Sequence, residues 1–203
     1  MIKRFIYRGF LVVVIFLPVS NAMSEDISFD YVQADYISDT VDLGGSIGDV
    51  EGDGIGFSLS LSFAPAFAMT LAVAAKTFRT FQGMGVDTSK TTALGVTAHT
   101  SVASGTEIFA NFSAVKAEIT ATDGIDSITD SDFGGIVSIG LRYLVTDAFE
   151  VELGASHLNV FGYGVNSYTV DARYYIRKKV SVGVGYAASD DVDSLLINAR
   201  MDI

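Results

Sequence analysis

The sequence predicts an all-β protein, a single antiparallel up-and-down β-barrel that crosses a lipid bilayer. First, the chain is 49% hydrophobic with a mean hydropathy of +0.40, yet no apolar run beyond the N-terminus approaches the roughly 20 residues that a spanning helix needs. Second, apolar residues alternate with small or polar ones at a period of two, which is the period of a strand. Third, the connections between the alternating segments are in turn short and long, as in membrane barrels.

The N-terminus has the three parts of a secretory signal peptide. Residues 3–8 carry three positive charges, residues 10–17 are apolar, and residues 20–22 include the small side chains that a signal peptidase requires. We expect cleavage after Ala22, which leaves residues 23–203 as the barrel domain. The cleaved segment holds three basic and no acidic residues, so the formal net charge changes from −11 to −14.

The composition excludes several classes of function. The chain contains no cysteine, which rules out disulfides, thiolate catalysis, cysteine metal sites and a lipoprotein anchor. Its acidic balance and its lack of a basic motif argue against binding to nucleic acid. The glycines recur at strand spacing and form no phosphate-binding loop, so we expect no cofactor.

Ten segments carry the alternation, which is clearest where Ile55, Phe57 and Leu59 alternate with Gly and Ser. An even number of strands places both termini on the periplasmic side, as an exported chain requires. We therefore predict ten strands, with an eight-stranded barrel as the alternative. The predicted strands are 27–37, 54–63, 68–79, 90–102, 106–119, 133–145, 149–160, 167–177, 180–188 and 194–203. The predicted short connections are 64–67, 103–105, 146–148 and 178–179, and the longer ones are 38–53, 80–89, 120–132, 161–166 and 189–193.

A soluble sandwich or lipocalin-like barrel would also alternate. Its water-facing side would be dominated by charge, whereas the polar side of these segments is mostly Gly, Ser and Ala. Such small residues suit the inside of a narrow barrel, and the apolar side then faces lipid. Aromatic residues near both ends of the segments, among them Phe63, Phe67, Tyr36 and Tyr168, are typical of the two membrane interfaces.

Three stretches carry a resemblance to a known family: FDYVQADY at 29–36, GLRYLVTD at 140–147 and ARYYI at 172–176. On these the chain resembles the small outer membrane barrels of the OmpA/OmpX-like and opacity-type group, and within it the ten-stranded "outer membrane beta-barrel protein" family. The resemblance implies a place in the cell outer membrane, reached with periplasmic chaperones and the outer-membrane assembly machinery. The last strand resembles the signal which that machinery recognises, although it ends in Ile203 where Phe or Trp is usual.

Charged residues on the polar side of the strands are predicted to meet in the lumen at the periplasmic end. Charges inside a narrow lumen need partners because an isolated one carries a large desolvation cost. We interpret them as an ion-pair network that plugs the barrel, and the alternative is a narrow pore lined by the same groups. The predicted members are Arg142, Arg173, Arg200, Glu107, Glu150, Glu152 and Asp171.

The longer connections are rich in Asp, notably 39–53, 123–132 and 190–193. The run at 49–54 has the acidic spacing of a calcium loop, but Ser60 stands where the twelfth position should be Glu. We expect a solvated surface, with divalent cations bridging the loops to anionic lipopolysaccharide as an alternative. The only histidines are His99 and His157, and neither has a carboxylate two residues away, so we expect no enzyme.

The sequence therefore predicts a small integral outer membrane barrel with a largely plugged lumen and a structural or surface-interaction role. Its expected partners are outer membrane lipid and lipopolysaccharide. The alternative function is a narrow porin-like channel for ions or small solutes.

Overall fold

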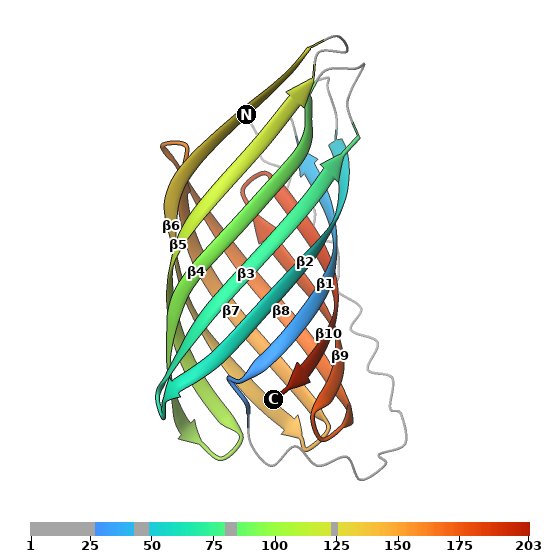
Figure 1. Cartoon of the computed structure of the whole chain (residues 1–203). Coiled ribbons are helices and arrows are strands. Elements are labelled where there is room, and N and C mark those ends of the chain that lie inside the picture. Colours follow the sequence, from blue (N-terminus) through green and yellow to red (C-terminus); the bar gives the residue numbers. More distant parts are fainter. Residues whose placement is uncertain (1–26, 43–48, 80–84, 123–125) are drawn as a thin grey trace, which may run out of the picture.

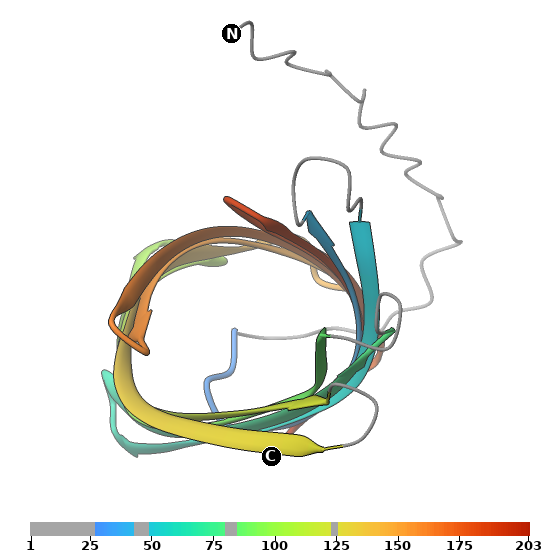
Figure 2. The ribbon, with the colours of Figure 1, turned by 90° about the horizontal axis from the view of Figure 1, so that it is seen from above.

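The computed structural model describes residues 27–42, 49–79, 85–122 and 126–203, and this part of the chain forms one closed barrel (Figure 1). Each strand pairs antiparallel with the next, and the first pairs with the last to close the ring (Figure 2). The strands are β1 (Tyr31–Asp42), β2 (Asp49–Ala64), β3 (Phe67–Phe78), β4 (Gly85–Ala103), β5 (Thr106–Thr122), β6 (Ser127–Thr146), β7 (Phe149–Val160), β8 (Tyr163–Arg177), β9 (Val180–Ser189) and β10 (Val192–Asp202). Ten strands are confirmed, and the eight-stranded alternative is wrong.

The sequence led us to expect a cleaved signal peptide and no membrane-spanning helix. The signal peptide and its cleavage position Ala22 fall outside the described residues, so they stay predictions. Among the residues that are described, no helix is long and apolar enough to cross a membrane.

The outer wall of the barrel is apolar on every strand. In β2, Ile55 is 69% exposed on the outside, whereas Ser60 on the opposite face is 1% exposed. Large exposed apolar side chains occur all round the ring, for example Tyr36, Ile55, Met69, Leu94, Phe112, Val137, Leu153, Val170, Val184 and Ile197. A continuous apolar surface of this kind is unfavourable in water and favourable against the hydrocarbon of a bilayer. The closed ladder pairs the backbone N–H and C=O groups, as a bilayer requires.

Among the described residues, tyrosine contacts on the outer wall lie at one end of the barrel, opposite the end at which β1 starts and β10 finishes. Tyr36 donates its phenol to Asp53 at 2.6 Å, and Tyr186 donates to Asp193 at 2.7 Å. At the opposite end Phe63 stacks on Phe67 with ring centroids 6.1 Å apart. Aromatic side chains at both ends of an apolar wall are typical of membrane interfaces.

The segment that leads into β1 and the end of β10 lie together, which defines the terminal end of the barrel; the opposite end is called the distal end. The backbone N–H of Ile203 donates to the carbonyl of Asp30 at 3.0 Å. The four predicted short connections are found at this end as two-residue turns, at 65–66, 104–105, 147–148 and 178–179. Gly105 takes a φ of +67° in one of them, a conformation that glycine adopts without strain.

The predicted connections at the distal end are too long. The ladder runs on to Asp42 in β1 and resumes at Asp49 in β2, and only two residues separate β9 from β10. The connection expected at 161–166 is a two-residue turn with φ of 54° at Phe161 and 73° at Gly162, as in a type I′ hairpin. The reason is that backbone pairing needs no apolar side chains, so strands continue past the point where the apolar alternation stops.

The first predicted strand begins too early. Strand β1 starts at Tyr31, and residues 27–30 are not part of the ladder. They cross the mouth of the lumen at the terminal end instead, where the blue segment lies inside the ring in Figure 2. Phe29 is consequently buried.

Candidate functional site

The centre of the lumen network is the carboxylate of Glu150, on the inner face of β7. Its Oε1 accepts hydrogen bonds from Arg142 Nε at 2.9 Å, from Arg142 Nη2 at 2.8 Å and from Arg173 Nη1 at 3.0 Å. Its Oε2 accepts from the phenol of Tyr175 at 2.9 Å. Glu150 and Arg142 are 1% and 2% exposed, so the group is sealed from solvent and its charges are compensated by one another.

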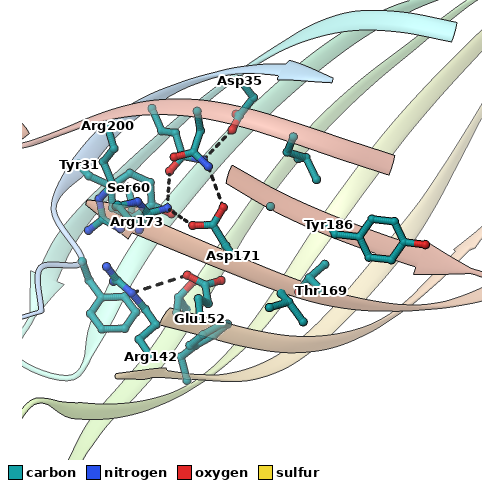
Figure 3. A pocket seen from close by; sticks show the side chains of 18 residues that line it. Tyr31, Asp35, Ser60, Arg142, Glu152, Thr169, Asp171, Arg173, Tyr186 and Arg200 are labelled. Carbon is teal, nitrogen blue, oxygen red and sulfur yellow. Dashed lines mark hydrogen bonds and ion pairs between the residues drawn. The ribbon is translucent and has the colours of Figure 1, made fainter. Parts of the chain in front are cut away.

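A second tier lies next to this centre and extends it toward β1 and β10 (Figure 3). Arg173 Nη2 lies 3.2 Å from Asp171 Oδ1 and donates to Gln33 Oε1 at 3.2 Å. Asn198 donates to Asp171 at 2.7 Å. Gln33 in turn donates to Asp35 at 2.8 Å, which extends the hydrogen-bond network along β1. Hydrogen bonds therefore cross the lumen from β7 through β8 to β1 and β10.

Glu152 and Arg200 are more loosely joined to the centre. The Glu152 carboxylate lies 3.7 Å from Arg142 Nε and is 29% exposed. The Arg200 guanidinium donates to Asp202 at 2.7 Å and lies over the ring of Tyr31 at 4.0 Å. Arg200 thus shares the layer but is neutralised by a carboxylate of its own strand.

Glu107 contacts residues other than the arginines. It lies directly opposite Arg142 in the strand register, but its carboxylate accepts from Ser101 and lies 3.5 Å from His99 Nδ1. The Arg142 guanidinium turns instead toward Glu150 and toward the backbone carbonyl of Ser28, to which it donates at 2.7 Å. Glu107 therefore lies at the depth of Arg142, but its described contacts are with Ser101 and His99 rather than with an arginine, and its membership of the network stays a prediction.

His99 has a carboxylate neighbour that the sequence pattern did not indicate, because Glu107 comes from the adjacent strand rather than from two residues away. The order of contacts is nonetheless unlike a nucleophilic triad, in which His stands between Ser and the acid. Here Ser101 donates to Glu107 itself. The other face of the His99 ring is stacked on Phe29, with ring centroids 3.8 Å apart.

Several members of the lumen network were not predicted from the sequence. Tyr175 and Asp202 share the parity of Arg173 and Arg200, so the alternation that found the arginines contains the signal for them. The backbone carbonyl of Ser28 has no sequence signal, because any residue could supply it. It accepts from both Arg142 and Arg200.

Asp39 was expected in an acidic connection and is found inside the lumen. It is 2% exposed, accepts from Lys76 at 2.6 Å and accepts from Ser194 at 2.7 Å. This pair forms a separate charged tier toward the distal end. The acidic run at 49–54 belongs to β2 rather than to a calcium loop. In the described ranges, no group of three or more His, Cys, Asp or Glu side chains could hold a metal ion.

The lumen is not filled throughout. A cavity of about 220 Å³ lies against the arginines and is lined by Phe29, Asp35 and Asp171 among others. A second cavity of about 330 Å³ is lined mainly by small and hydroxyl side chains, such as Ser113, Ser138 and Ser156. The two cavities share Tyr31, Thr97, Phe109, Glu152 and Thr169 in their walls, so they are adjacent parts of one space.

No family model matches the chain, and no curated protein matches it. Solved structures with a similar fold include Neisserial surface protein A, at 14% identity, 87% coverage of this chain, 98% of that chain and a TM-score of 0.48. The KdgM porin is 13% identical over 84% of this chain and 99% of that one, with a TM-score of 0.46. Ail, the attachment invasion locus protein of Yersinia pestis, is 10% identical over 87% and 99%, with a TM-score of 0.45. The chain is thus similar in outline to small outer membrane barrels, and the likeness says nothing of function.

Proposed function

We propose that this protein is an integral barrel of a Gram-negative outer membrane, with a lumen closed at its terminal end and a structural or surface-interaction role. The apolar outer wall supports a place in a bilayer. The expected signal peptide, and the start of β1 and the end of β10 at the same end of the barrel, support export with the terminal end facing the periplasm.

The observation that carries the proposal is the sealed node at Glu150. Two guanidiniums and one phenol converge on a carboxylate that is 1% exposed. Separating these charges to let solutes pass would leave buried ions without partners, which costs on the order of 3–5 kcal/mol for each broken pair. The node therefore favours a lumen that is narrowed at its terminal end over a wide, permanently open pore.

Conductance in planar lipid bilayers tests the proposal. We expect refolded wild-type barrel to insert without producing a steady open state. A reproducible open level in every insertion would contradict a closed lumen.

A narrow channel is the second candidate, and the two adjacent lumen cavities favour it. Glu152 lines both cavities and is partly exposed, so it would face any ions that entered. If the barrel conducts, Glu152→Lys should reverse the sign of its ion selectivity. An unchanged reversal potential in that variant would count against conduction through this lumen.

We also propose that the acidic distal end faces lipopolysaccharide. Asp42, Asp190 and Asp191 lie at or beside the strand ends there, and Asp42 N–H donates to the carbonyl of Asp191 at 2.9 Å. Divalent cations would bridge such carboxylates to anionic lipid. Calorimetric titration of the refolded barrel with Ca²⁺, with and without lipopolysaccharide, tests this: heat only when both are present supports bridging, and no heat in either case contradicts it.

A further inference from the structure

The segment 28–30 is held in the mouth of the lumen by contacts that come from several strands. The carbonyl of Ser28 accepts from Arg142 on β6 and from Arg200 on β10. The ring of Phe29 stacks on His99 of β4, meets Phe109 of β5 edge-on with centroids 6.3 Å apart, and lies 4.9 Å below the guanidinium of Arg142. Phe29 is only 7% exposed as a result.

Residues 28–30 are not part of the barrel wall. They contribute no rung to the strand ladder. Besides the two arginine bonds to Ser28, the segment is held by Ser62 N–H of β2, which donates to the Asp30 side chain, and by Ile203 N–H, just after β10, which donates to the Asp30 carbonyl. The segment could therefore leave the mouth while all ten strand pairings remain. Displacement would cost the hydrogen bonds at Ser28 and Asp30 and the contacts of the Phe29 ring with His99, Phe109 and Arg142, and the Glu150 node would keep its own partners.

Phe29 also forms part of the wall of the 220 Å³ cavity that adjoins the arginines. Withdrawal of its ring would join this cavity to the mouth at the terminal end. Since the two lumen cavities are adjacent, a path would then run from that mouth past Thr97 and Glu152 into the wider part of the barrel.

The charge along such a path has a definite sign. Carboxylates outnumber cations among the charged side chains that face the lumen of the described strands. The carboxylates are Asp35, Asp39, Glu107, Glu150, Glu152, Asp171 and Asp202, and the cations are Lys76, Arg142, Arg173 and Arg200. A negatively charged lumen concentrates cations and excludes anions.

We infer that residues 28–30 are a displaceable stopper, and that their withdrawal converts the closed barrel into a narrow, cation-preferring channel. The inference rests on the proposed closed lumen and adds a gate and a selectivity to it. The stopper closes the mouth from the terminal end by placing an aromatic ring and a carbonyl under the arginines. The ladder and the Glu150 node stay in place in both states.

The test compares wild type with Phe29→Ala and with Phe63→Ala in planar bilayers. Phe63 is the matched control because it lies near the same end but is exposed on the outer wall, 65%. We expect conductance steps in F29A and none in the control, with a reversal potential shifted toward that of the cation in a KCl gradient. Heat-modifiable migration on gels establishes that each variant is folded.

A reversible lock adds a second arm, which is available because the chain has no cysteine of its own. F29C/H99C is joined by a short bifunctional thiol reagent across the place where the two rings now stack. We expect the joined barrel to be silent and the same barrel to conduct after the linker is cleaved.

A folded F29A that is as silent as wild type overturns the stopper and leaves the closed lumen standing. An anion-selective F29A overturns the proposed selectivity. A wild-type barrel that conducts steadily contradicts the closed lumen, and the stopper then stands only if F29A conducts more than wild type does.

Discussion

Glu150→Gln removes the charge at the centre of the network and keeps the size of the side chain. In the native barrel the carboxylate compensates two guanidiniums, those of Arg142 and Arg173, at 2.8 and 3.0 Å. The neutral amide can still accept from one or two donors, so the loss is mainly electrostatic. For a pair this deeply buried, breaking the charge compensation costs on the order of 3–5 kcal/mol.

Glu152→Gln is the matched control, because it makes the same chemical change on the same strand. Its carboxylate lies 3.7 Å from Arg142 and is 29% exposed, so solvent screens the pair. Partly exposed pairs of this kind contribute about 0–1 kcal/mol. We therefore expect the two substitutions to differ by at least roughly 2 kcal/mol, the lower end of the buried range less the upper end of the exposed one.

Equilibrium unfolding by urea in phospholipid vesicles measures this difference, with heat-modifiable migration as the readout of folded barrel. The result that refutes the reasoning is a pair of equal unfolding free energies. It would mean that the lumen at Glu150 is as well hydrated as it is at Glu152. A loss confined to Glu150→Gln supports a sealed node.

Three further predictions address the wall of the barrel. Gly134→Ala should sharply lower the yield of folded barrel in vesicles, because a Cβ there would overlap the carbonyl oxygen of Asn159. Gly135→Ala should fold normally, since the nearest neighbour of a Cβ there is at 3.7 Å. Equal yields would contradict this register. Phe161→Asn should stabilise the barrel by about 0.5–1 kcal/mol in urea unfolding, because Asn adopts a positive φ more readily than Phe in a type I′ turn, and a loss of stability would refute that turn. Ile139→Arg should destabilise it by about 2–4 kcal/mol in vesicles if this outward residue, 61% exposed, meets the bilayer interior; an effect under about 0.5 kcal/mol, the usual range for surface substitutions, would place it in water.

The strands could be predicted because lipid on one side and a narrow lumen on the other impose a strict period of two on side-chain polarity. The same logic found the buried Arg142 and Glu150. It did not find where strands end, as at Asp42, because the ladder continues beyond the apolar belt. Asp39 was misplaced for that reason, since it lies on a stretch of strand that looked like a connection.

The rest of the site depends on geometry that parity does not encode. Glu107 has the right parity and depth but different lateral contacts, because the Arg142 guanidinium is already engaged by Glu150 and by a backbone carbonyl. Phe29 stands in an alternating stretch and so resembled the start of a strand. Its departure from the ladder depends on contacts with residues 70 or more positions away, which no local pattern could indicate.

The carbonyl of Ser28 receives hydrogen bonds from β6 and β10 and belongs to the short segment that leads into β1, so it links three distant parts of the chain at one atom. Both bonds to that atom can exist together only once β10 has paired with β1, because Arg200 comes from β10 and Ser28 leads into β1. Until then Arg142 and Arg200 remain within reach of water on one side. The lumen around these arginines therefore loses its water only when the barrel closes. A barrel whose two edge strands have not joined stays hydrated inside.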